Sequence, residues 1–322
     1  MTAPDLAAFR AAAKRIAGKV RQTPMLPTAP HGPDLDGGAG ADVLLKLECL
    51  QASGSFKARG AMNKLLSLDE AAAAAGLITA SGGNHGLAVA WAAKMAGVPA
   101  SVYLPTSAPS DKAEALRALG ADVTVEGAVW DEANAAALEQ ARAQGLTYVH
   151  PFADPAVIAG QGTLGLEILA QAKDVDTVIV AIGGGGLISG VATALKAAKP
   201  GVKVVGVEPV GAPTLYESLK AGELVTLSRI ETAAGTLAPR RSMPLNYEMI
   251  AAAVDAMALV TDAEMRSAAR LLWREFGLAV ELAGAAAAAA LMAGRYVPEP
   301  GERVCLIICG KGADGFGDAT PP

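Results

Sequence analysis

The sequence contains few aromatic residues and few cysteines. Aromatic residues make up 4% of its 322 positions, and the three cysteines are Cys49, Cys305 and Cys309. Their odd number and their spacing argue against a disulfide framework and against a cysteine-based metal site. We therefore expect a protein of a reducing compartment, the cytoplasm, in which the cysteines pack in the core.

The sequence also lacks an excess of positive charge and any long hydrophobic run. The net charge is -5, and no Lys/Arg cluster interleaved with aromatic residues is present, so nucleic acid is not expected as a partner. The most apolar run, residues 282–294, is mostly alanine and is shorter than the roughly 20 residues that cross a bilayer. Residues 1–10 do not resemble a secretory signal. We expect no membrane partner, and we interpret residues 282–294 as a buried helix.

Hydrophobic residues are abundant, at 52%, and they gather in short runs between alanine-rich segments. The runs predict buried parallel strands, and the alanine-rich segments predict the helices that connect them. The expected fold class is therefore α/β, with open, mostly parallel sheets. The predicted strands cover residues 43–47, 77–80, 100–104, 122–125, 177–182, 202–207 and 304–309, and the clearest predicted helices cover 86–96, 111–119, 131–143 and 187–198. Residues 31–42 are expected to form a surface loop and residues 316–322 a frayed tail.

Four consecutive glycines separate one predicted strand from the helix that follows it. Bare backbone amides at the start of a helix form an anion site, although a tight turn alone is the simpler interpretation. Neither register of the glycines meets the dinucleotide spacing G-x-G-x-x-G, and Gly310–Lys311 lacks the preceding glycine of a P-loop. A single phosphate monoester fits this segment better. The candidate phosphate-binding residues are Gly183, Gly184, Gly185, Gly186 and Leu187.

Two further segments with candidate catalytic or binding residues also join a predicted strand to a predicted helix. In residues 53–60, Lys57 follows Phe56 and is either a solvated surface lysine or a desolvated Schiff-base amine. Residues 81–86 offer backbone amides suited to a carboxylate and one amide side chain. The candidate substrate-binding residues there are Ser81, Gly82, Gly83, Asn84 and His85. We interpret His85 as an orienting or packing residue rather than as a general base.

These three segments, in this order and spacing, resemble the fold type II enzymes that depend on pyridoxal 5'-phosphate (PLP). The resemblance is to the serine/threonine dehydratase and serine racemase branch and covers nearly the whole chain, with support from residues 151–152, 160–163, 206–209 and 309–310. It implies a tryptophan synthase β-like fold of two open, twisted, mostly parallel α/β domains with the active site between them. Residues 1–72 and 151–322 would form the large PLP-binding domain, and residues 73–150 the small substrate-loop domain. A homodimer is common in this family.

The resemblance also implies a role for individual residues. Lys57 would bind the cofactor covalently and later take the α-proton of the substrate, while Phe56 would pack against the cofactor ring. Asn84 would hold the ring hydroxyl, the amides of residues 183–187 would hold the phosphate, and Cys309 would be a neutral partner of the pyridine nitrogen. A neutral partner favours prompt loss of a β-leaving group over transamination. The expected activity is an ammonia-lyase that converts L-threonine, L-serine or a related β-hydroxy amino acid to a 2-oxo acid and ammonia.

Several positions depart from the family pattern. Racemases of this branch resemble Ser-Ser-Gly-Asn-His at the substrate loop, whereas this chain has Gly82 at the second serine, so we expect little racemase activity. Members that bind a divalent cation have a carboxylate where this chain has Thr214; Glu208 and Ala212 match the rest of that set, and no metal is assigned. The chain ends soon after Cys309, so no C-terminal regulatory domain is expected.

Other functions remain open at this point. They are serine racemase, 3-hydroxyaspartate dehydratase, and a non-catalytic module that binds PLP or an amino acid. A 3-hydroxyaspartate substrate has a second carboxylate, for which Arg240 and Arg241 are the candidates, although two arginines in this polar stretch are more typical of a solvated surface.

Overall fold

The computed structural model describes residues 2–28, 35, 38–108 and 110–316. Half of the predicted loop at 31–42, and all of the predicted tail at 316–322 except residue 316, lie outside these described residues. Within them, no helix is long and apolar enough to cross a membrane.

The strands form two separate sheets. The large sheet has the order β1 (Met25–Pro27), β2 (Asp42–Lys46), β10 (Arg303–Ile307), β7 (Thr177–Ala181), β8 (Lys203–Pro209) and β9 (Ala256–Val260), and only β1 is antiparallel to its neighbour. The small sheet has the order β5 (Asp122–Val125), β4 (Ala100–Leu104), β3 (Leu77–Ala80) and β6 (Thr147–Tyr148), and all its pairs are parallel. This architecture confirms the predicted open α/β class with parallel sheets.

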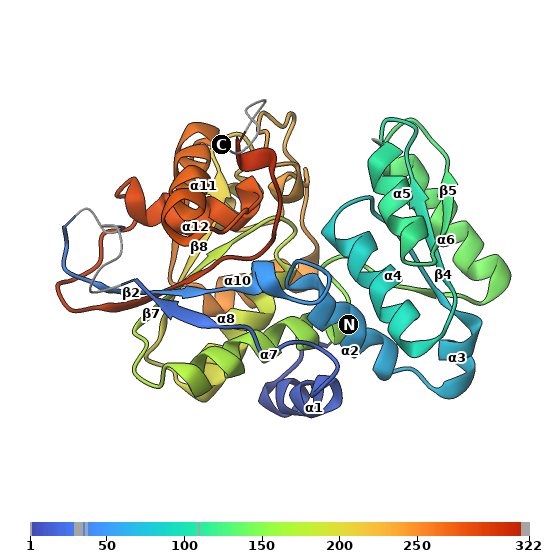
Figure 1. Ribbon diagram of the computed structural model, residues 1–322, viewed down its shortest axis with the longest axis horizontal. Coiled ribbons are helices and arrows are strands. Elements are labelled where there is room, and N and C mark those ends of the chain that lie inside the picture. Colours follow the sequence, from blue (N-terminus) through green and yellow to red (C-terminus); the bar gives the residue numbers. More distant parts are fainter. Residues whose placement is uncertain (1, 29–34, 36–37, 109, 317–322) are drawn as a thin grey trace.

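Helices cover both faces of the large sheet. Figure 1 shows α11 (Asp262–Phe276) and α12 (Leu282–Met292) on one face, and α1 (Leu6–Ile16), α7 (Pro155–Gln171) and α8 (Gly186–Ala198) on the other. The remaining helices near this sheet are α2 (Lys57–Leu66), α9 (Thr214–Ala221) and α10 (Pro244–Ala253). Residues 282–291 of α12 are all buried, as predicted, and seven of them are alanine, whose short side chain lets the helix lie close to the strands.

The small sheet carries its own helices, in a lobe that Figure 1 shows at the right of the molecule. They are α3 (Glu70–Ala75), α4 (Asn84–Ala96), α5 (Ser110–Ala118) and α6 (Trp130–Gln144). Gly97 and Gly145 end α4 and α6 in the left-handed conformation, which confirms both as stop signals. At the start of α11, Thr261 and Glu264 form a complete capping box.

Predicted and observed boundaries differ by one or two residues. The largest consequence is at α4, which begins at Asn84 rather than at Gly86, so that two candidate site residues belong to its first turn. The sequence did not predict β1, β6 or β9. The first two have only three and two residues, and β1 ends in a proline that is tolerated at a sheet edge.

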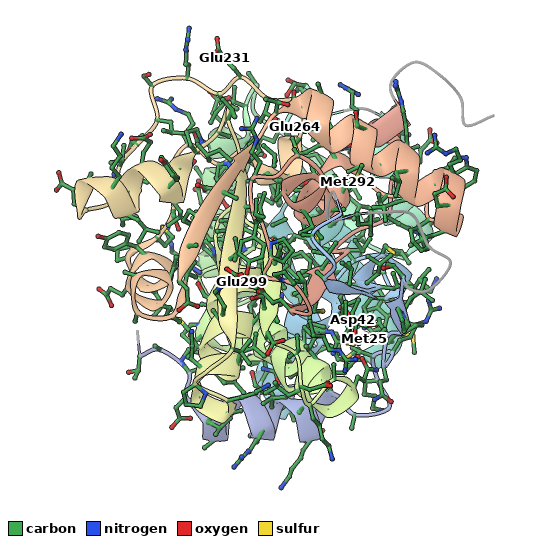
Figure 2. All side chains as sticks on the ribbon, turned by 90° about the vertical axis from the view of Figure 1, so that its left-hand side faces the viewer. Met25, Asp42, Glu231, Glu264, Met292 and Glu299 are labelled. Carbon is green, nitrogen blue, oxygen red and sulfur yellow. The ribbon has the colours of Figure 1, made fainter. Side chains whose placement is uncertain are left out.

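The amino ends of the large-sheet strands form a polar edge. This edge is remote from the candidate catalytic and binding segments, which follow the carboxyl ends of the strands. At the polar edge, Arg303 forms ion pairs with Asp42, at 2.5 Å, and with Asp174. Figure 2 labels Asp42 on this side of the molecule. These pairs are partly solvated, so their contribution to stability is small, and the chemistry is expected at the opposite, carboxyl ends of the strands.

Candidate active site

The candidate residues follow the carboxyl ends of strands from both sheets. The segment with Lys57 follows β2, the tetraglycine segment follows β7, and Cys309 follows β10, while residues 81–86 follow β3 and residues 149–152 follow β6. Parallel strands bring such segments together at one edge of a sheet, where open α/β proteins bind their ligands. In Figure 1, α2, which begins at Lys57, lies between the two lobes.

Lys57 is the first residue of α2 and is half-buried. Its Nζ donates a hydrogen bond to the carbonyl oxygen of Pro151 at 2.6 Å and lies 5.2 Å from the centre of the Phe56 ring. Burial lowers the pKa of Lys57 to about 8, and the electrostatic interactions of the amine with Cys309 and Glu281 oppose this shift only in part. Lys57 is therefore not a solvated surface lysine, and a large fraction of its amine is neutral at mildly alkaline pH.

This pKa can be measured by competitive acetylation of the cofactor-free protein. Only the neutral amine reacts, so labelling of Lys57 is expected to rise with pH through a midpoint near 8, whereas surface lysines have an ordinary pKa of about 10.4. Peptide mass spectrometry across pH 6 to about 11 follows both populations in one sample. A midpoint for Lys57 that coincides with the surface lysines would contradict the desolvated environment.

A buried ion network fixes the first turn of α2. Arg59 forms two hydrogen bonds with the carboxylate of Glu48, at 2.7 and 2.8 Å, and a third with Glu167 at 2.9 Å. Lys46, fully buried at the end of β2, pairs with Glu167 at 2.6 Å. Two cations and two carboxylates balance in charge, which is the condition for keeping them buried. The network ties α2 to β2 and α7, and the sequence alone did not predict it.

The substrate loop, residues 81–86, is a tight turn. A Cβ on Gly86 would lie 1.9 Å from the carbonyl oxygen of Ser81, so only glycine fits there. The backbone amide of Gly83 donates to the Ser81 hydroxyl at 3.3 Å. The ring of His85 is buried and its Nε2 donates to the carbonyl of Val149 at 2.9 Å. Burial lowers the pKa of His85 to about 3, helped by the positive charge of Lys57, so the ring is neutral, and its role as an orienting or packing residue stays a prediction.

The tetraglycine segment packs too closely for any side chain and leaves its amides unpaired. A Cβ on Gly184 would lie 2.3 Å from the Phe152 ring, one on Gly183 would lie 2.6 Å from the Thr236 carbonyl oxygen, and Gly185 has φ +94°. Within the described residues, no protein group accepts a hydrogen bond from the backbone amides of residues 183–187. The segment is thus both a tight turn and, at the start of α8, a set of amides available to an anion.

Cys309 connects the end of β10 with the lysine segment. Its carbonyl oxygen accepts the backbone N–H of Phe56 at 3.1 Å, and its thiol donates to the carbonyl oxygen of Ala283 at 3.3 Å. Burial and the nearby carboxylate of Glu281 raise the pKa of the thiol well above its usual value. The side chain is therefore a neutral hydrogen-bonding group close to Lys57.

Three residues of the site were not predicted from the sequence: His150, Thr236 and Glu281. His150 accepts the backbone N–H of Ala153 at 2.9 Å, and burial lowers its pKa to about 4, so it is a neutral acceptor. Thr236 lies between the substrate loop and the tetraglycine segment. Glu281 directly precedes the apolar run 282–294, and a carboxylate at the start of a buried helix is the signal that could have identified it.

The residues considered for a cation lie at the end of β8 and shortly after it. The carboxylate of Glu208 accepts the backbone amides of Leu215 and Tyr216, at 2.9 and 2.7 Å, and so caps the start of α9. Burial raises its pKa to about 8. In the described part of the chain, no three His, Cys, Asp or Glu side chains are grouped as metal ligands. A metal at Glu208 and Ala212 stays unassigned.

Arg240 and Arg241 lie on the protein surface. Arg240 donates to the carbonyl of Leu227, and Arg241 donates to the carbonyl of Leu224 and the hydroxyl of Thr226. Both side chains are thereby committed to the exposed segment that precedes α10, and neither is among the groups that contact Lys57 or the substrate loop.

These features define an α/β enzyme site for a phosphate-bearing carbonyl compound: a lysine of lowered pKa, unpaired amides at a helix start and a neutral thiol. The chain belongs to the pyridoxal-phosphate dependent enzyme family, whose sequence pattern matches residues 16–310. PLP is accordingly its cofactor, and the residues present fit it: Lys57 for the carbonyl carbon, the amides of 183–187 for the phosphate and Cys309 for the ring nitrogen.

Individual relatives indicate which members of the family this chain is similar to. The chain is 41% identical over 275 residues to L-threonine ammonia-lyase of Thermotoga maritima, covering 85% of this chain and 68% of the relative. It is 39% identical over 316 residues to phenylserine dehydratase of Ralstonia pickettii, covering 97% and 94%. Among solved structures, maize serine racemase superposes with a TM-score of 0.91 at 33% identity, over 96% of this chain and 94% of that one.

Proposed function

We propose that this enzyme is an ammonia-lyase that eliminates water and ammonia from L-threonine, L-serine or a related β-hydroxy amino acid. The observation that carries the proposal is the pairing of the Lys57 amine, with its pKa near 8, and the neutral thiol of Cys309 in one site. Relatives named threonine ammonia-lyase and phenylserine dehydratase, each at about 40% identity, support the same reaction type.

The protein would contribute binding and orientation for the cofactor. The amides of residues 183–187 would hold its phosphate with the help of the α8 dipole. The Cys309 thiol would be a neutral partner of its ring nitrogen, Phe56 would pack beside the ring, and Asn84 would bind the ring hydroxyl. When bound, PLP supplies an electron sink for the bond between Cα and its hydrogen.

Lys57 moves the proton. Its amine is desolvated and has a pKa of about 8, close to neutral pH. It can therefore accept the α-proton of the substrate at Nζ and later return to its resting state. The amides of Ser81, Gly82 and Gly83 hold the substrate carboxylate at the start of α4. We further propose that residues 73–150 move as a small domain over the substrate, so that the loop excludes water while the β-hydroxyl leaves.

Gly82 separates elimination from racemisation. A racemase needs a proton donor on the face opposite Lys57, and Gly82 provides no hydroxyl there. The likeness to maize serine racemase therefore supports a common fold rather than a common reaction. Racemisation is the second candidate function. The surface positions of Arg240 and Arg241 make a substrate with a second carboxylate less favourable.

The test is a direct assay of the purified enzyme with PLP. L-threonine, L-serine and L-threo-phenylserine are supplied separately, and 2-oxo acid and ammonia are both quantified. We expect equal amounts of the two products with at least one substrate. From L-serine we expect D-serine at less than about a tenth of the amount of pyruvate, because one proton-transfer group contributes about 10²–10⁴-fold to the rate and Gly82 cannot supply one. D-serine formed as fast as pyruvate would make serine racemase the better assignment. The absence of turnover with every substrate would favour a non-catalytic module that binds PLP or an amino acid.

We also propose that the enzyme works in the cytoplasm as a homodimer. Three free, buried cysteines support a reducing compartment, and dimers are common in the family that the sequence resembles. Light scattering of the purified holoenzyme measures the second point, and a monomeric mass would reject it.

A further inference from the structure

The carboxyl group of Glu281 lies at the junction between the substrate loop and the large sheet. Its side chain is almost fully buried, with 8% of the residue exposed. Oε1 accepts a hydrogen bond from Nδ2 of Asn84 at 2.6 Å, and Oε2 lies 3.5 Å from the hydroxyl of Thr236. A buried carboxyl is retained at a cost in desolvation, so its hydrogen bonds need a structural or functional reason.

The bond between Asn84 and Glu281 connects the two sheets. Asn84 begins α4, directly after β3 of the small sheet, whereas Glu281 precedes α12, which packs on β7, β8, β9 and β10 of the large sheet. The two residues are 197 positions apart in the sequence. A carboxyl that belongs to the large sheet thus holds the first side chain of the helix that follows the substrate loop.

The surrounding backbone encloses this contact. A Cβ on Gly310 would lie 2.2 Å from Oε1 of Glu281 and 3.2 Å from Nδ2 of Asn84, and a Cβ on Gly312 would lie 2.8 Å from Cβ of Glu281. Glycine at these two positions lets the segment after Cys309 pass directly beside the pair. The contact is therefore part of the packed site and not a loose surface interaction.

The hydrogen-bonding capacity of the two groups fixes the orientation of the amide. A carboxylate only accepts, so it selects the Nδ2 side of Asn84 and excludes the flipped amide. Nδ2 has two hydrogens. One is given to Glu281, and the other remains available at a defined angle for an oxygen atom of a ligand. The direction in which Asn84 can donate is thus set by Glu281.

We propose that Glu281 is a positioning residue of this enzyme: it orients the Asn84 amide across the boundary between the sheets, and so determines how tightly and in what environment PLP is held. The inference rests on the proposed role of Asn84 at the ring hydroxyl of PLP. Glu281 itself acts through Asn84, and its second oxygen, near Thr236, keeps the carboxyl plane from turning.

The charged groups around Glu281 allow it to act as an acceptor near neutral pH. Burial raises its pKa to about 7, and the negative charge of Asp314 adds to this, while Asn84, Thr236 and the positive charge of Lys57 oppose the shift. Cys309 faces it as a neutral thiol, and Arg266 reaches only the backbone of Asp314. The ionised carboxyl fixes the Asn84 amide, whereas the protonated carboxyl has one O–H donor and no longer excludes the flipped amide.

The experiment compares two replacements that separate hydrogen bonding from shape. Glu281→Gln keeps an acceptor for Asn84, and its amide can donate to the Thr236 hydroxyl, whereas Glu281→Leu has similar volume and no acceptor. The Glu281 side chain makes no helix-cap hydrogen bond, so neither change removes a cap of α12. Glu299→Leu is the control, because Glu299 is exposed on the side of the molecule shown in Figure 2.

The readouts are the dissociation constant of PLP and the visible absorbance band of the holoenzyme, with kcat and KM measured in addition. Loss of an oriented hydrogen bond to a charged group is expected to weaken PLP binding about 10-fold in Glu281→Leu and to shift the band. Glu281→Gln is expected to stay within about 3-fold of the parent and to keep its band, which is the recovery that an acceptor role requires.

A double variant tests whether Glu281 acts through Asn84. If it does, Asn84→Ala combined with Glu281→Leu weakens PLP binding no further than Asn84→Ala alone. Additive losses, an unchanged band in Glu281→Leu, or a Gln variant as impaired as the Leu variant would each overturn the proposal. Because cofactor affinity and absorbance need no substrate, these results stand even if the ammonia-lyase assay fails, and the two proposals are tested separately.

Discussion

Replacing Lys57 by alanine is expected to reduce turnover by at least about 10³-fold, within the range that a single proton-transfer group contributes, and to remove the visible absorbance band of the holoenzyme. The reason is that one amine both joins the protein to PLP and accepts the α-proton. Burial has already lowered the pKa of this amine to about 8, and Pro151 fixes its direction. Absorbance spectra and 2-oxo acid release on the same preparation measure both effects.

The matched control for this substitution is Lys64→Ala in the same helix. Lys64 lies in the last turn of α2 and forms a largely buried ion pair with Asp154 at 2.7 Å. We expect this variant to keep both turnover and the band, because Lys64 pairs with Asp154 and not with a residue proposed to hold PLP. A Lys57→Ala enzyme that still turns over substrate, or still shows the band without added amine, would refute the assignment of Lys57.

Replacing Gly184 by alanine is expected to weaken PLP binding about 10- to 100-fold, since overpacking a well-packed position costs about 1–3 kcal/mol. The added Cβ would lie 2.3 Å from the Phe152 ring, and Phe152 also contacts Gly186 at the start of α8. Either the ring or the tetraglycine segment must move. Because the amides of residues 183–187 act together on one phosphate, a shift of any of them weakens the whole set.

Gly201→Ala provides the control for the general effect of adding a methyl group. Gly201 lies in the turn between α8 and β8, and a Cβ there would contact nothing within 4 Å. PLP titration and thermal unfolding of both variants distinguish a local effect from a global one. If Gly184→Ala binds PLP as tightly as Gly201→Ala does, the tetraglycine segment is a turn without a role in phosphate binding.

Local sequence signals predicted a large part of this protein because they depend on neighbouring residues alone. Periodic apolar runs predicted the central strands within one or two residues, and Thr261, Gly97 and Gly145 marked helix ends through capping and left-handed backbone. The segments around Lys57, Asn84 and Gly183 were recognised together because each joins a strand to a helix, where backbone amides are free. Short edge strands such as β1 gave no such signal, since pairing with a neighbour rather than their own pattern makes them strands.

Only the tertiary structure decided which side chains meet. The hydrogen bond of Asn84 to Glu281 and the ion network of Arg59, Glu48 and Glu167 join residues that are distant in the sequence, so no local pattern contains them. The same holds for the state of each group. Whether Lys57 is solvated, whether Cys309 is neutral and whether His85 can take a proton depend on burial, which raises the free energy of the charged form. The sequence by itself determined most of the elements and the family of this enzyme, and folding determined the electrostatics of its site.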